Sequence, residues 1–297
     1  MQEQQPAPDP ARQYPGPEAQ EAEQQEWPGR TGEMQRRPDH GEHSYQGHGR
    51  LTGRRAVITG GDSGIGRAVA IAYAREGADL VISYLPEEEE DARETAHWVR
   101  EAGRTVVTAP GDLREEEYCE QLIALAESAL GGVDILVNNA AFQMNQPEIT
   151  DITTAQFDRV MKTNLYALFW LCRAAVPRMA PGSSIINLSS IQAAQSSPGL
   201  LDYATTKAGI TAFTKALAAG LADRGIRVNA IAPGPVWTPL IPATMPPEKV
   251  AQFGANTPLG RVGQPAELAP AFVFFASPES SYITGELLAV TGGRPMS

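Results

Sequence analysis

Cysteine and histidine are scarce in this sequence of 297 residues, which contains two cysteines and four histidines. Three histidines, His40, His43 and His48, lie in a polar N-terminal stretch, where spaced histidines are usually solvated and bind metals only weakly. Zinc sites need clusters of Cys and His at short spacings, and none occurs here. We therefore expect no metal site, which excludes a zinc-dependent alcohol dehydrogenase. Cys119 and Cys172 are expected to be unpaired packing residues in a reducing compartment.

Long apolar runs and an excess of positive charge are also missing. No stretch approaches the roughly 18 apolar residues of a membrane helix, and the N-terminal MQEQQPAPDP has no apolar segment of the signal-peptide kind. The 24 Lys and Arg residues are outnumbered by 35 Asp and Glu residues, so the formal net charge is −11. Such a charge repels phosphate backbones and anionic lipid surfaces. We expect a soluble cytoplasmic protein whose partners include neither nucleic acid nor a membrane.

Residues 1–50 lack valine, isoleucine, leucine and phenylalanine altogether and are rich in Gln, Pro, Glu, Gly and Arg. A segment of this composition buries too little apolar surface to offset the entropy lost on ordering. We therefore divide the chain into a polar N-terminal extension, residues 1–50, and a folded domain, residues 51–297. By itself the extension should be disordered, although Tyr14, Trp27 and Tyr45 can anchor it on the domain or on a neighbouring subunit.

After Leu51, short β-branched runs alternate with helical stretches, which predicts an α/β fold. Seven runs have the continuous apolar character of strands that are buried on both faces. They are residues 56–60, 79–84, 105–112, 134–140, 184–190, 227–234 and 286–293. The helical stretches are residues 64–77, 87–103, 114–132, 154–179, 202–225 and 265–277. This alternation predicts a single doubly wound Rossmann domain, with a seven-stranded parallel sheet and helices on both faces.

A glycine-rich turn, TGGDSGIG at residues 59–66, joins the first predicted strand to the first helix. Such a turn brings backbone N–H groups and the positive end of the helix against a phosphate, because side chains would block the approach. Gly60, Gly64 and Gly66 are the candidate positions. A tight turn without a ligand is the alternative, but the strand, turn and helix context favours a dinucleotide. Phosphoryl transfer is disfavoured, because the turn ends in GIGR and lacks the GK[ST] of a Walker loop.

The choice of dinucleotide depends on the end of the second strand, which reads SYLPEEEED at residues 83–91. An acidic group there favours the ribose 2′-hydroxyl of NAD, whereas a basic group favours the 2′-phosphate of NADP. The segment has no Lys or Arg, Asp62 lies in the glycine turn, and four glutamates begin at Glu87. The sequence therefore predicts NAD(H) as the favoured cofactor. NADP(H) stays possible, because Tyr84 replaces the usual Asp and backbone groups can serve either dinucleotide.

The segment YATTK, residues 203–207, places a phenol and an ammonium group four positions apart on a predicted helix. Their Cβ atoms are then roughly 5 to 6 Å apart, and at about 5 Å with a dielectric near 20 the Coulomb energy is about 3 kcal/mol. That interaction can lower the pKa of Tyr203 by up to about two units, which makes the phenol a usable acid or base. By itself, a YxxxK spacing usually indicates only that two residues lie on the same face of a helix. Here a strand that ends at Ser190 precedes it, and such strand ends bind ligands.

Six ordered motifs together resemble the short-chain dehydrogenase/reductase family. They are TGGDSGIG, NNAA at 138–141, KTNL at 162–165, Ser190, YATTK and PGPVWT at 233–238. Their order and spacing match that family from about Leu51 to Gly293. Further runs, among them YLPEEEED, SSIQA and LLDYATTK, resemble a bacterial branch with an N-terminal extension, described as glucose/ribitol dehydrogenase-like or general-stress oxidoreductases.

The resemblance implies an NAD(P)-dependent oxidoreductase that interconverts an alcohol and its carbonyl compound by hydride transfer. Tyr203 would exchange a proton with the substrate oxygen, and Ser190 would form a hydrogen bond with that oxygen. Lys207 would lower the pKa of the phenol and hold the nicotinamide ribose. Asn164 would support a water molecule that relays protons to Lys207.

The same resemblance implies a larger set of cofactor-binding residues. Asp112 in the GDL motif would face the adenine ring, Ala140 would lie near the adenine ribose, and Asn138 would steady the central strand. The remaining expected positions are Gly60, Asp62, Ser63, Gly64, Ile65, Gly66, Tyr84, Leu113, Tyr203, Lys207, Pro233, Gly234, Val236 and Thr238. One departure is Ala141, where the family commonly has glycine, so that a methyl group narrows the site.

Residues 237–261, rich in Pro and Gly, are expected to select the substrate, either as a movable lid or as an ordinary surface loop with a short helix. Gln143, Gln192 and Gln195 follow strand ends and can meet a hydroxylated substrate, or they are solvated loop amides. We expect a small alcohol or carbonyl substrate such as a polyol, a sugar or an aldehyde.

Predicted helical segments 163–176 and 208–222 carry apolar groups on more than one face, as expected when a second face packs on another subunit. The family resemblance points to a homotetramer.

Two other functions compete with an oxidoreductase. A serine hydrolase would pair Ser190 with Lys207, but the sequence has no GxSxG elbow and only His97 lies within the domain. The second is a regulatory protein that binds the nucleotide without turnover.

Overall fold

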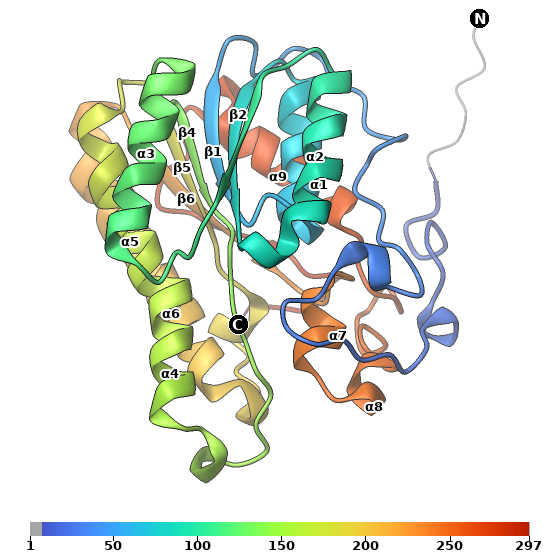
Figure 1. Ribbon diagram of the computed structural model, residues 1–297. Coiled ribbons are helices and arrows are strands. Elements are labelled where there is room, and N and C mark those ends of the chain that lie inside the picture. The colour runs from blue at the N-terminus through green and yellow to red at the C-terminus, as the bar shows by residue number, and fades with distance from the viewer. Residues whose placement is uncertain (1–7, 297) are drawn as a thin grey trace, which may run out of the picture.

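The computed structural model describes residues 8–296, and its centre is one seven-stranded sheet (Figure 1). All neighbouring strands are parallel, in the order β3-β2-β1-β4-β5-β6-β7. The strands are β1 (Arg55–Thr59), β2 (Asp79–Tyr84), β3 (Val106–Pro110), β4 (Ile135–Asn138), β5 (Ser184–Leu188), β6 (Arg227–Pro233) and β7 (Leu287–Val290). The chain reverses its direction of winding between β1 and β4, which places a ligand crevice at their carboxyl ends. The predicted parallel Rossmann sheet is confirmed.

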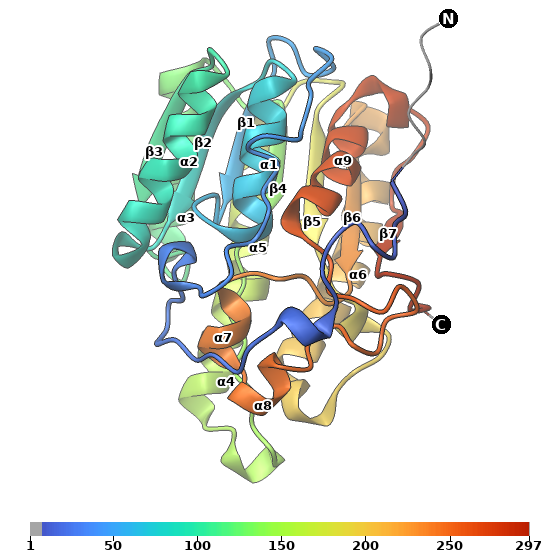
Figure 2. The same cartoon turned by 90° about the vertical axis from the view of Figure 1, so that its right-hand side faces the viewer.

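Helices cover both faces of the sheet, so alternate side chains of each strand enter two separate cores. The helices are α1 (Gly64–Arg75), α2 (Glu89–Glu101), α3 (Glu116–Leu130), α4 (Thr154–Met161), α5 (Ala167–Ala175), α6 (Leu201–Leu221), α7 (Leu240–Thr244), α8 (Pro247–Val250) and α9 (Pro265–Ala276). Ile58 of β1 packs in the core under α1 and α9, whereas Val57 packs in the core under α3, α5 and α6 (Figure 2). Burial on both faces explains why the inner strands are apolar throughout, whereas the edge strands β3 and β7 are only partly buried.

The single long helix predicted over residues 154–179 is interrupted in the structure. Between α4 and α5 lies a π-helical turn, Lys162–Tyr166, and a 3-10 turn follows α5. A π turn adds one residue to a helical turn and frequently marks a functional site. Asn164 lies in this turn, where its buried side chain bonds the backbone of Phe142.

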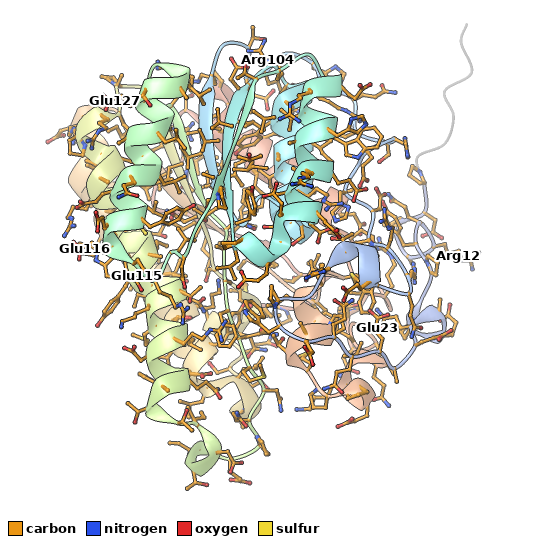
Figure 3. All side chains as sticks on the ribbon, in the orientation of Figure 1. Arg12, Glu23, Arg104, Glu115, Glu116 and Glu127 are labelled. Atoms are coloured by element: carbon orange, nitrogen blue, oxygen red, sulfur yellow. The ribbon has the colours of Figure 1, made fainter. Side chains whose placement is uncertain are left out.

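Residues 8–50 lie against the folded domain as an irregular chain with short turns, on which Figure 3 labels Arg12 and Glu23. Met34 is buried beside Trp237, whose Nε1 donates a hydrogen bond of 2.8 Å to the backbone oxygen of Arg36. Two views show this segment, coloured dark blue, passing beside α7 (Figure 1, Figure 2). The extension therefore follows the surface of the domain here, and the domain boundary at residue 50 stays a prediction.

Residues 237–261 contain α7 and α8 and form a small core of their own. Trp237, Ile241 and Val250 are its buried members from this segment, and Met34 of the extension packs among them. This core is separate from the two cores on the sheet. The segment and the extension therefore stabilise each other.

Two further observations concern membrane spans and thiols. Within residues 8–296, no helix has both the length and the apolar character required to cross a membrane. Cys119 on α3 and Cys172 on α5 are free and buried in the same sheet core, and burial raises the pKa of each thiol to about 12. Both thiols are therefore uncharged packing groups at neutral pH.

Candidate active site

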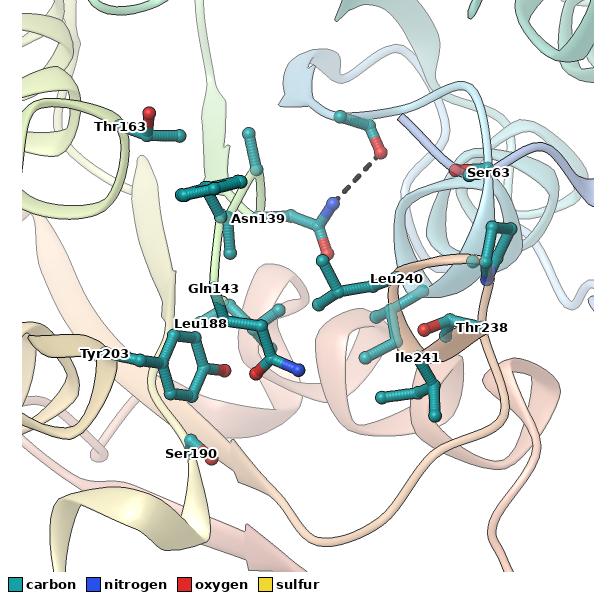
Figure 4. A pocket seen from close by; sticks show the side chains of 18 of the residues that line it. Ser63, Asn139, Gln143, Thr163, Leu188, Ser190, Tyr203, Thr238, Leu240 and Ile241 are labelled. Atoms are coloured by element: carbon teal, nitrogen blue, oxygen red, sulfur yellow. Dashed lines mark hydrogen bonds between the residues drawn. The ribbon is translucent and has the colours of Figure 1, made fainter. Parts of the chain in front are cut away.

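One large pocket of about 280 Å³ opens at the carboxyl ends of the strands (Figure 4). Its walls come from the glycine turn after β1, the ends of β2 to β6, and α7. The predicted site residues that line it are Gly60, Asp62, Ser63, Gly64, Ile65, Tyr84, Asp112, Leu113, Ala140, Ser190, Tyr203, Pro233, Gly234, Val236 and Thr238. Four other predicted residues, Gly66, Asn138, Asn164 and Lys207, are not among its lining residues.

Gly66 acts through packing beneath the glycine turn. A Cβ atom at this position would lie 1.8 Å from the backbone oxygen of Gly60, so a side chain would push α1 away from the turn. Gly60 and Gly64 have positive φ values of 60° and 49°, a backbone region that favours glycine. The three glycines therefore have different functions: two allow the sharp turn, and Gly66 lets the helix begin in contact with it.

Asn139 ties the end of β4 to the glycine turn. Its Nδ2 donates hydrogen bonds to the backbone oxygens of Thr59 at 2.9 Å and Gly60 at 3.0 Å, and Figure 4 shows Asn139 at the centre of the pocket. The backbone N–H groups of Asn139 and Ala140 both donate to Thr59 Oγ1. The NNAA motif was the available sequence signal, but this particular contact depends on the pairing of β1 with β4.

Two hydroxyl groups, from Ser190 and Tyr203, lie on one side of the pocket with Gln143 beside them (Figure 4). Ser190 follows β5, and its Oγ accepts a hydrogen bond of 3.1 Å from the N–H of Gln192. The neighbouring Ser189 instead donates its hydroxyl to the backbone oxygen of Lys207 at 3.0 Å. Ser189 is therefore engaged with α6, whereas Ser190 is the serine beside the phenol.

Burial has the largest effect on the pKa of the Tyr203 phenol. Desolvation raises the pKa of its phenol to about 12, although the Ser190 hydroxyl opposes the shift. Lys207 Nζ lies 5.2 Å from the centre of the phenol ring and donates a 2.7 Å hydrogen bond to the backbone oxygen of Leu188. Burial also lowers the pKa of Lys207 to about 7. The predicted lowering of the phenol pKa is therefore not found here, because the ammonium points at a carbonyl group and is itself partly discharged by desolvation.

Asn164 fixes the loop that follows β4. Its Oδ1 accepts a hydrogen bond of 2.7 Å from the N–H of Phe142, and its Nδ2 donates to the oxygen of Phe142 at 2.8 Å. The same Nδ2 lies 3.1 Å from Thr206 Oγ1, next to Lys207 on α6. These contacts occupy the amide, and its role beside a relay water stays a prediction.

Asn138 lies beneath the pocket and connects two central strands. Its Nδ2 donates a hydrogen bond of 2.8 Å to Asn187 Oδ1, which joins β4 to β5. The side chain is buried, and Cys172 Sγ lies 3.5 Å from the same nitrogen. These contacts steady the strand; the structure does not place Asn138 at the pocket surface, where a cofactor contact was predicted.

Two carboxyl groups mark the β2 end of the pocket. Asp62 and Glu88 both line it, and burial raises the pKa of each carboxyl, with the charge of Asp62 adding to the shift at Glu88. Within residues 8–296, Asp62 Oδ2 is buried without a hydrogen-bond partner. Tyr84 directs its hydroxyl away from them to Glu89 Oε2 at 2.5 Å. Burial keeps Glu88 protonated at neutral pH, whereas Asp62, with a pKa of about 6, is ionised and supplies the acidic character expected at this end.

The pocket also contains residues that the motifs did not indicate. Arg114 follows β3, Arg159 lies on α4 and Arg294 lies near the C-terminus, while Trp27 and Gly29 belong to the extension. Arg114 directly follows the GDL motif, so a local signal was available for it. Arg159, Arg294, Trp27 and Gly29 approach the pocket only through long-range folding, and their one signal was an aromatic side chain, Trp27, in an otherwise polar segment.

Comparison with known proteins assigns the family. A family model described as Enoyl-(Acyl carrier protein) reductase matches residues 60–294. A crystal structure of a short chain dehydrogenase from Burkholderia cenocepacia J2315 in complex with NADP is 30% identical, with a TM-score of 0.77, covering 82% of this chain and 98% of that one. The chain belongs to the short-chain dehydrogenase/reductase family.

Other members of this family extend the similarity. The Escherichia coli (strain K12) protein named Uncharacterized oxidoreductase YghA is 52% identical over 92% of this chain and 93% of its own length. The Glucose and ribitol dehydrogenase homolog of Oryza sativa subsp. japonica is 46% identical over 95% of this chain and 98% of its own length. A short chain dehydrogenase from Mycobacterium paratuberculosis bound to NAD has a TM-score of 0.75 and 31% identity, covering 82% of this chain and 98% of that one.

Proposed function

We propose that this protein is a cytoplasmic NAD(P)-dependent oxidoreductase that interconverts a small alcohol and its carbonyl compound. Membership of the short-chain dehydrogenase/reductase family supports redox chemistry with a nicotinamide cofactor. One observation carries the proposal beyond that: the hydroxyls of Ser190 and Tyr203 share a single pocket with the glycine turn. A dinucleotide and a substrate oxygen can therefore meet in one place.

The residues of the pocket fit a nicotinamide dinucleotide. The turn from Gly60 to Gly64 leads directly into α1, so its backbone and the positive helix end suit a diphosphate. At the β2 end, the unpartnered Oδ2 of Asp62 suits a ribose hydroxyl. The cofactor, when bound, supplies or accepts the hydride, and the protein supplies orientation and proton transfer.

Tyr203 is the proposed proton donor and acceptor. With a pKa of about 12, its phenol is protonated at neutral pH and can donate to a carbonyl oxygen in the direction of reduction. Ser190, on the same side of the pocket, is placed to donate a hydrogen bond to that oxygen. Lys207 lies 5.2 Å from the phenol ring centre, where its protonated form stabilises the phenolate left after transfer.

The substitution Tyr203→Phe tests this role because it removes only the phenolic oxygen. General acid catalysis contributes about 10² to 10⁴ in rate, so turnover should fall by that factor. The Kd for the nicotinamide dinucleotide, measured by calorimetric titration, should not change. Tyr282→Phe is the matched control, because Tyr282 is fully exposed and should retain wild-type activity. Full activity of Tyr203→Phe would contradict the mechanism.

NAD(H) is the proposed preference over NADP(H). The carboxyl group of Asp62 lies at the β2 end of the pocket and, with a pKa of about 6, is ionised at neutral pH, so a 2′-phosphate there would add like charge. The test is to compare the Kd values of NADH and NADPH at pH 7.5 for the wild-type protein and for Asp62→Asn. We expect tighter binding of NADH, and a smaller difference in the variant. Clearly tighter binding of NADPH by the wild-type protein would contradict the preference.

The proposed substrate is a polyol, a sugar or a similar small alcohol or aldehyde. Gln143 and Gln192 line the pocket beside Tyr203 and can bind hydroxyl groups. Gln195 does not line it; its side chain holds the C-terminal segment through hydrogen bonds to Arg294 and Pro295. The name of the rice relative also points to sugars and polyols. A panel of alcohols and carbonyl compounds with both cofactors tests this; cofactor binding without turnover across the panel would favour the regulatory alternative.

A homotetramer is the proposed assembly. Phe157, Tyr166 and Phe169, from α4, the π-helical turn and α5, are 39%, 47% and 45% exposed. Large apolar side chains gathered on one surface commonly mark a contact between subunits. Sedimentation should show four subunits, and Phe169→Glu should shift the distribution towards smaller species. A stable wild-type monomer would contradict the assembly.

A further inference from the structure

Part of the N-terminal extension crosses beside the pocket, and we call residues 25–31 the strap. At one end, the N–H of Gln25 donates a hydrogen bond of 3.0 Å to the oxygen of Pro242 in α7. At the other end, the N–H of Thr31 donates 2.8 Å to Asp91 Oδ2 in α2. Both α7 and the chain just before α2 supply lining residues of the pocket. The strap is therefore fixed to two separate parts of the pocket wall.

The anchor at Asp91 also reaches the glycine turn. Asp91 Oδ1 accepts a hydrogen bond of 2.9 Å from Arg67, a fully buried residue of α1. The Nε of Arg67 in turn donates 2.9 Å to the backbone oxygen of Asp62. Thr31, Asp91, Arg67 and Asp62 thus form a continuous chain of polar contacts. The position of the strap is therefore connected to the glycine turn, which would face the phosphates of a bound dinucleotide.

Close packing sets the path of the strap past α7. Gly29 is buried and lines the pocket. A Cβ atom at Gly29 would lie 2.4 Å from the backbone oxygen of Pro239 and 3.0 Å from the Cβ of Ala243. No side chain fits between the strap and α7 at this point. The backbone of the strap is therefore itself part of the pocket wall.

Trp27 joins the strap to the loop after β4. Its ring meets that of Phe142 edge to face, with centroids 4.8 Å apart and an interplanar angle of 85°. Arg159 places its guanidinium 4.1 Å from the centroid of Phe142 and 5.4 Å from that of Trp27. All three side chains line the pocket. Because Asn164 holds the backbone of Phe142, the ring of Trp27 rests on a rigid support.

The indole N–H of Trp27 has an unmet hydrogen-bonding requirement. Within residues 8–296, Nε1 is shielded from solvent and has no acceptor. A buried donor without a partner costs about 1 to 3 kcal/mol, and buried tryptophan N–H groups usually find a partner. A dinucleotide in this pocket carries many phosphate and hydroxyl oxygens that can accept such a bond.

We propose that Trp27 is a cofactor-binding residue, which covers the bound dinucleotide with its ring and, once the ring has turned towards the cofactor, donates its Nε1–H to one of the cofactor oxygens. This inference rests on the proposed function. Binding would thereby satisfy the indole nitrogen, which has no acceptor among residues 8–296. Dissociation would require the strap to move away from α7, so the extension acts chiefly on the rate of cofactor release.

The experiment compares full-length wild-type protein with Trp27→Ala and Trp27→Phe. Calorimetric titration gives the Kd for NADH, and stopped-flow displacement of NADH by excess NAD gives the release rate through nicotinamide fluorescence. We expect Trp27→Ala to raise both quantities by about tenfold, the equivalent of one lost aromatic contact and hydrogen bond. Trp27→Phe keeps a ring but lacks the N–H, so it should raise both by about threefold. Unchanged values in Trp27→Ala would overturn the proposal, and unchanged values in Trp27→Phe would overturn the hydrogen bond.

A matched control is Tyr14→Ala, which removes another aromatic ring of the extension. Tyr14 contacts Asp39 and Arg261 and is not among the lining residues, so this variant should keep the wild-type Kd. Thermal unfolding of each variant checks that the fold is intact. The experiment separates a failure of the proposed function from a failure of this inference. Wild-type protein that binds neither NADH nor NADPH would contradict the proposed function. Wild-type binding that Trp27→Ala leaves unaltered would contradict only this inference.

Discussion

The floor and the cover of the pocket are built in different ways. The floor comprises the glycine turn, residues 59–66, together with Ser190 and Tyr203, and it rests on the ends of parallel strands and on α6. The cover comprises the strap, residues 25–31, and residues 237–253, which are irregular chain and short helices. Backbone ladders hold the floor, whereas isolated hydrogen bonds and one small core hold the cover.

This difference explains which part of the site can vary. Residues of the floor are positioned by a sheet whose strands are buried on both faces, so a change there disturbs the whole domain. The cover has its own core and can loosen without breaking the sheet. Chemistry is therefore expected to depend on the floor, and ligand selection and release on the cover.

The largest effect in this comparison is expected from Gly66→Ala in the floor. The added methyl group would lie 1.8 Å from the oxygen of Gly60, so α1 must move away from the turn. We expect loss of measurable dinucleotide binding and a fall in the unfolding free energy of several kcal/mol, as for severe overpacking. Gly220→Ala is the matched control, because nothing lies within 4 Å of its Cβ position on α6. That control should be neutral or slightly stabilising in the same denaturant unfolding experiment.

Lys207→Met is expected to change the pH dependence of stability. The pKa of Lys207 is lowered to about 7 in the folded protein, from an unfolded value of 10.5. Between these pH values the unfolded chain binds more protons, so the wild-type unfolding free energy gains about 1.4 kcal/mol per pH unit from this group. Below about pH 7 both states are protonated and the full cost of burying the charge remains. Urea unfolding without cofactor should show this slope in the wild-type protein and its loss in the variant; equal slopes would contradict the burial of the ammonium.

A smaller effect on overall stability is expected from Met34→Ala, in the small core on which the cover rests. Met34 is buried against Trp237 and Ile241, so its truncation leaves a cavity in the small core. Truncating a buried Met to Ala lowers the unfolding free energy of a protein by about 2 to 5 kcal/mol. We expect the lower end of this range, because the residues around Met34 belong to a small core and can move into the cavity. Hydrogen exchange should increase in residues 25–40 and 237–253 but not in the strands. Ile58→Ala, in the sheet core, is the contrasting variant and should increase exchange across the strands; equal exchange patterns would remove the distinction between floor and cover.

The strands were predictable because each is a short apolar run, and the sheet buries β1, β2, β4, β5 and β6 on both faces, although the edge strands β3 and β7 are partly exposed. Helix α6 and the glycine turn were predictable because their sequence patterns involve only neighbouring residues. The interruption of helix 154–179 was missed because nothing in KTNLY itself requires a π turn. Its stability depends on bonds from Asn164 to Phe142, a residue 22 positions earlier in the chain.

The candidate site was likewise predictable only where its sequence signals are local. Motifs indicated Ser190, Tyr203 and the glycine turn, and the structure brings them to one pocket. The direction of the Tyr203 pKa shift was predicted wrongly, because helical spacing gives the distance to a lysine but not the extent of burial. Trp27 could not be assigned to the pocket, because its approach depends on how the extension crosses α7.

By itself, the sequence determined the order of strands and helices and the residue types at the carboxyl ends of the strands, because hydrophobic periodicity and short motifs act over a few neighbouring residues. Only the tertiary structure decided which polar groups became buried, how far their pKa values moved, and that the N-terminal extension supplies part of the pocket wall. Desolvation and packing depend on what every other segment places nearby, so these properties exist only once the chain has folded.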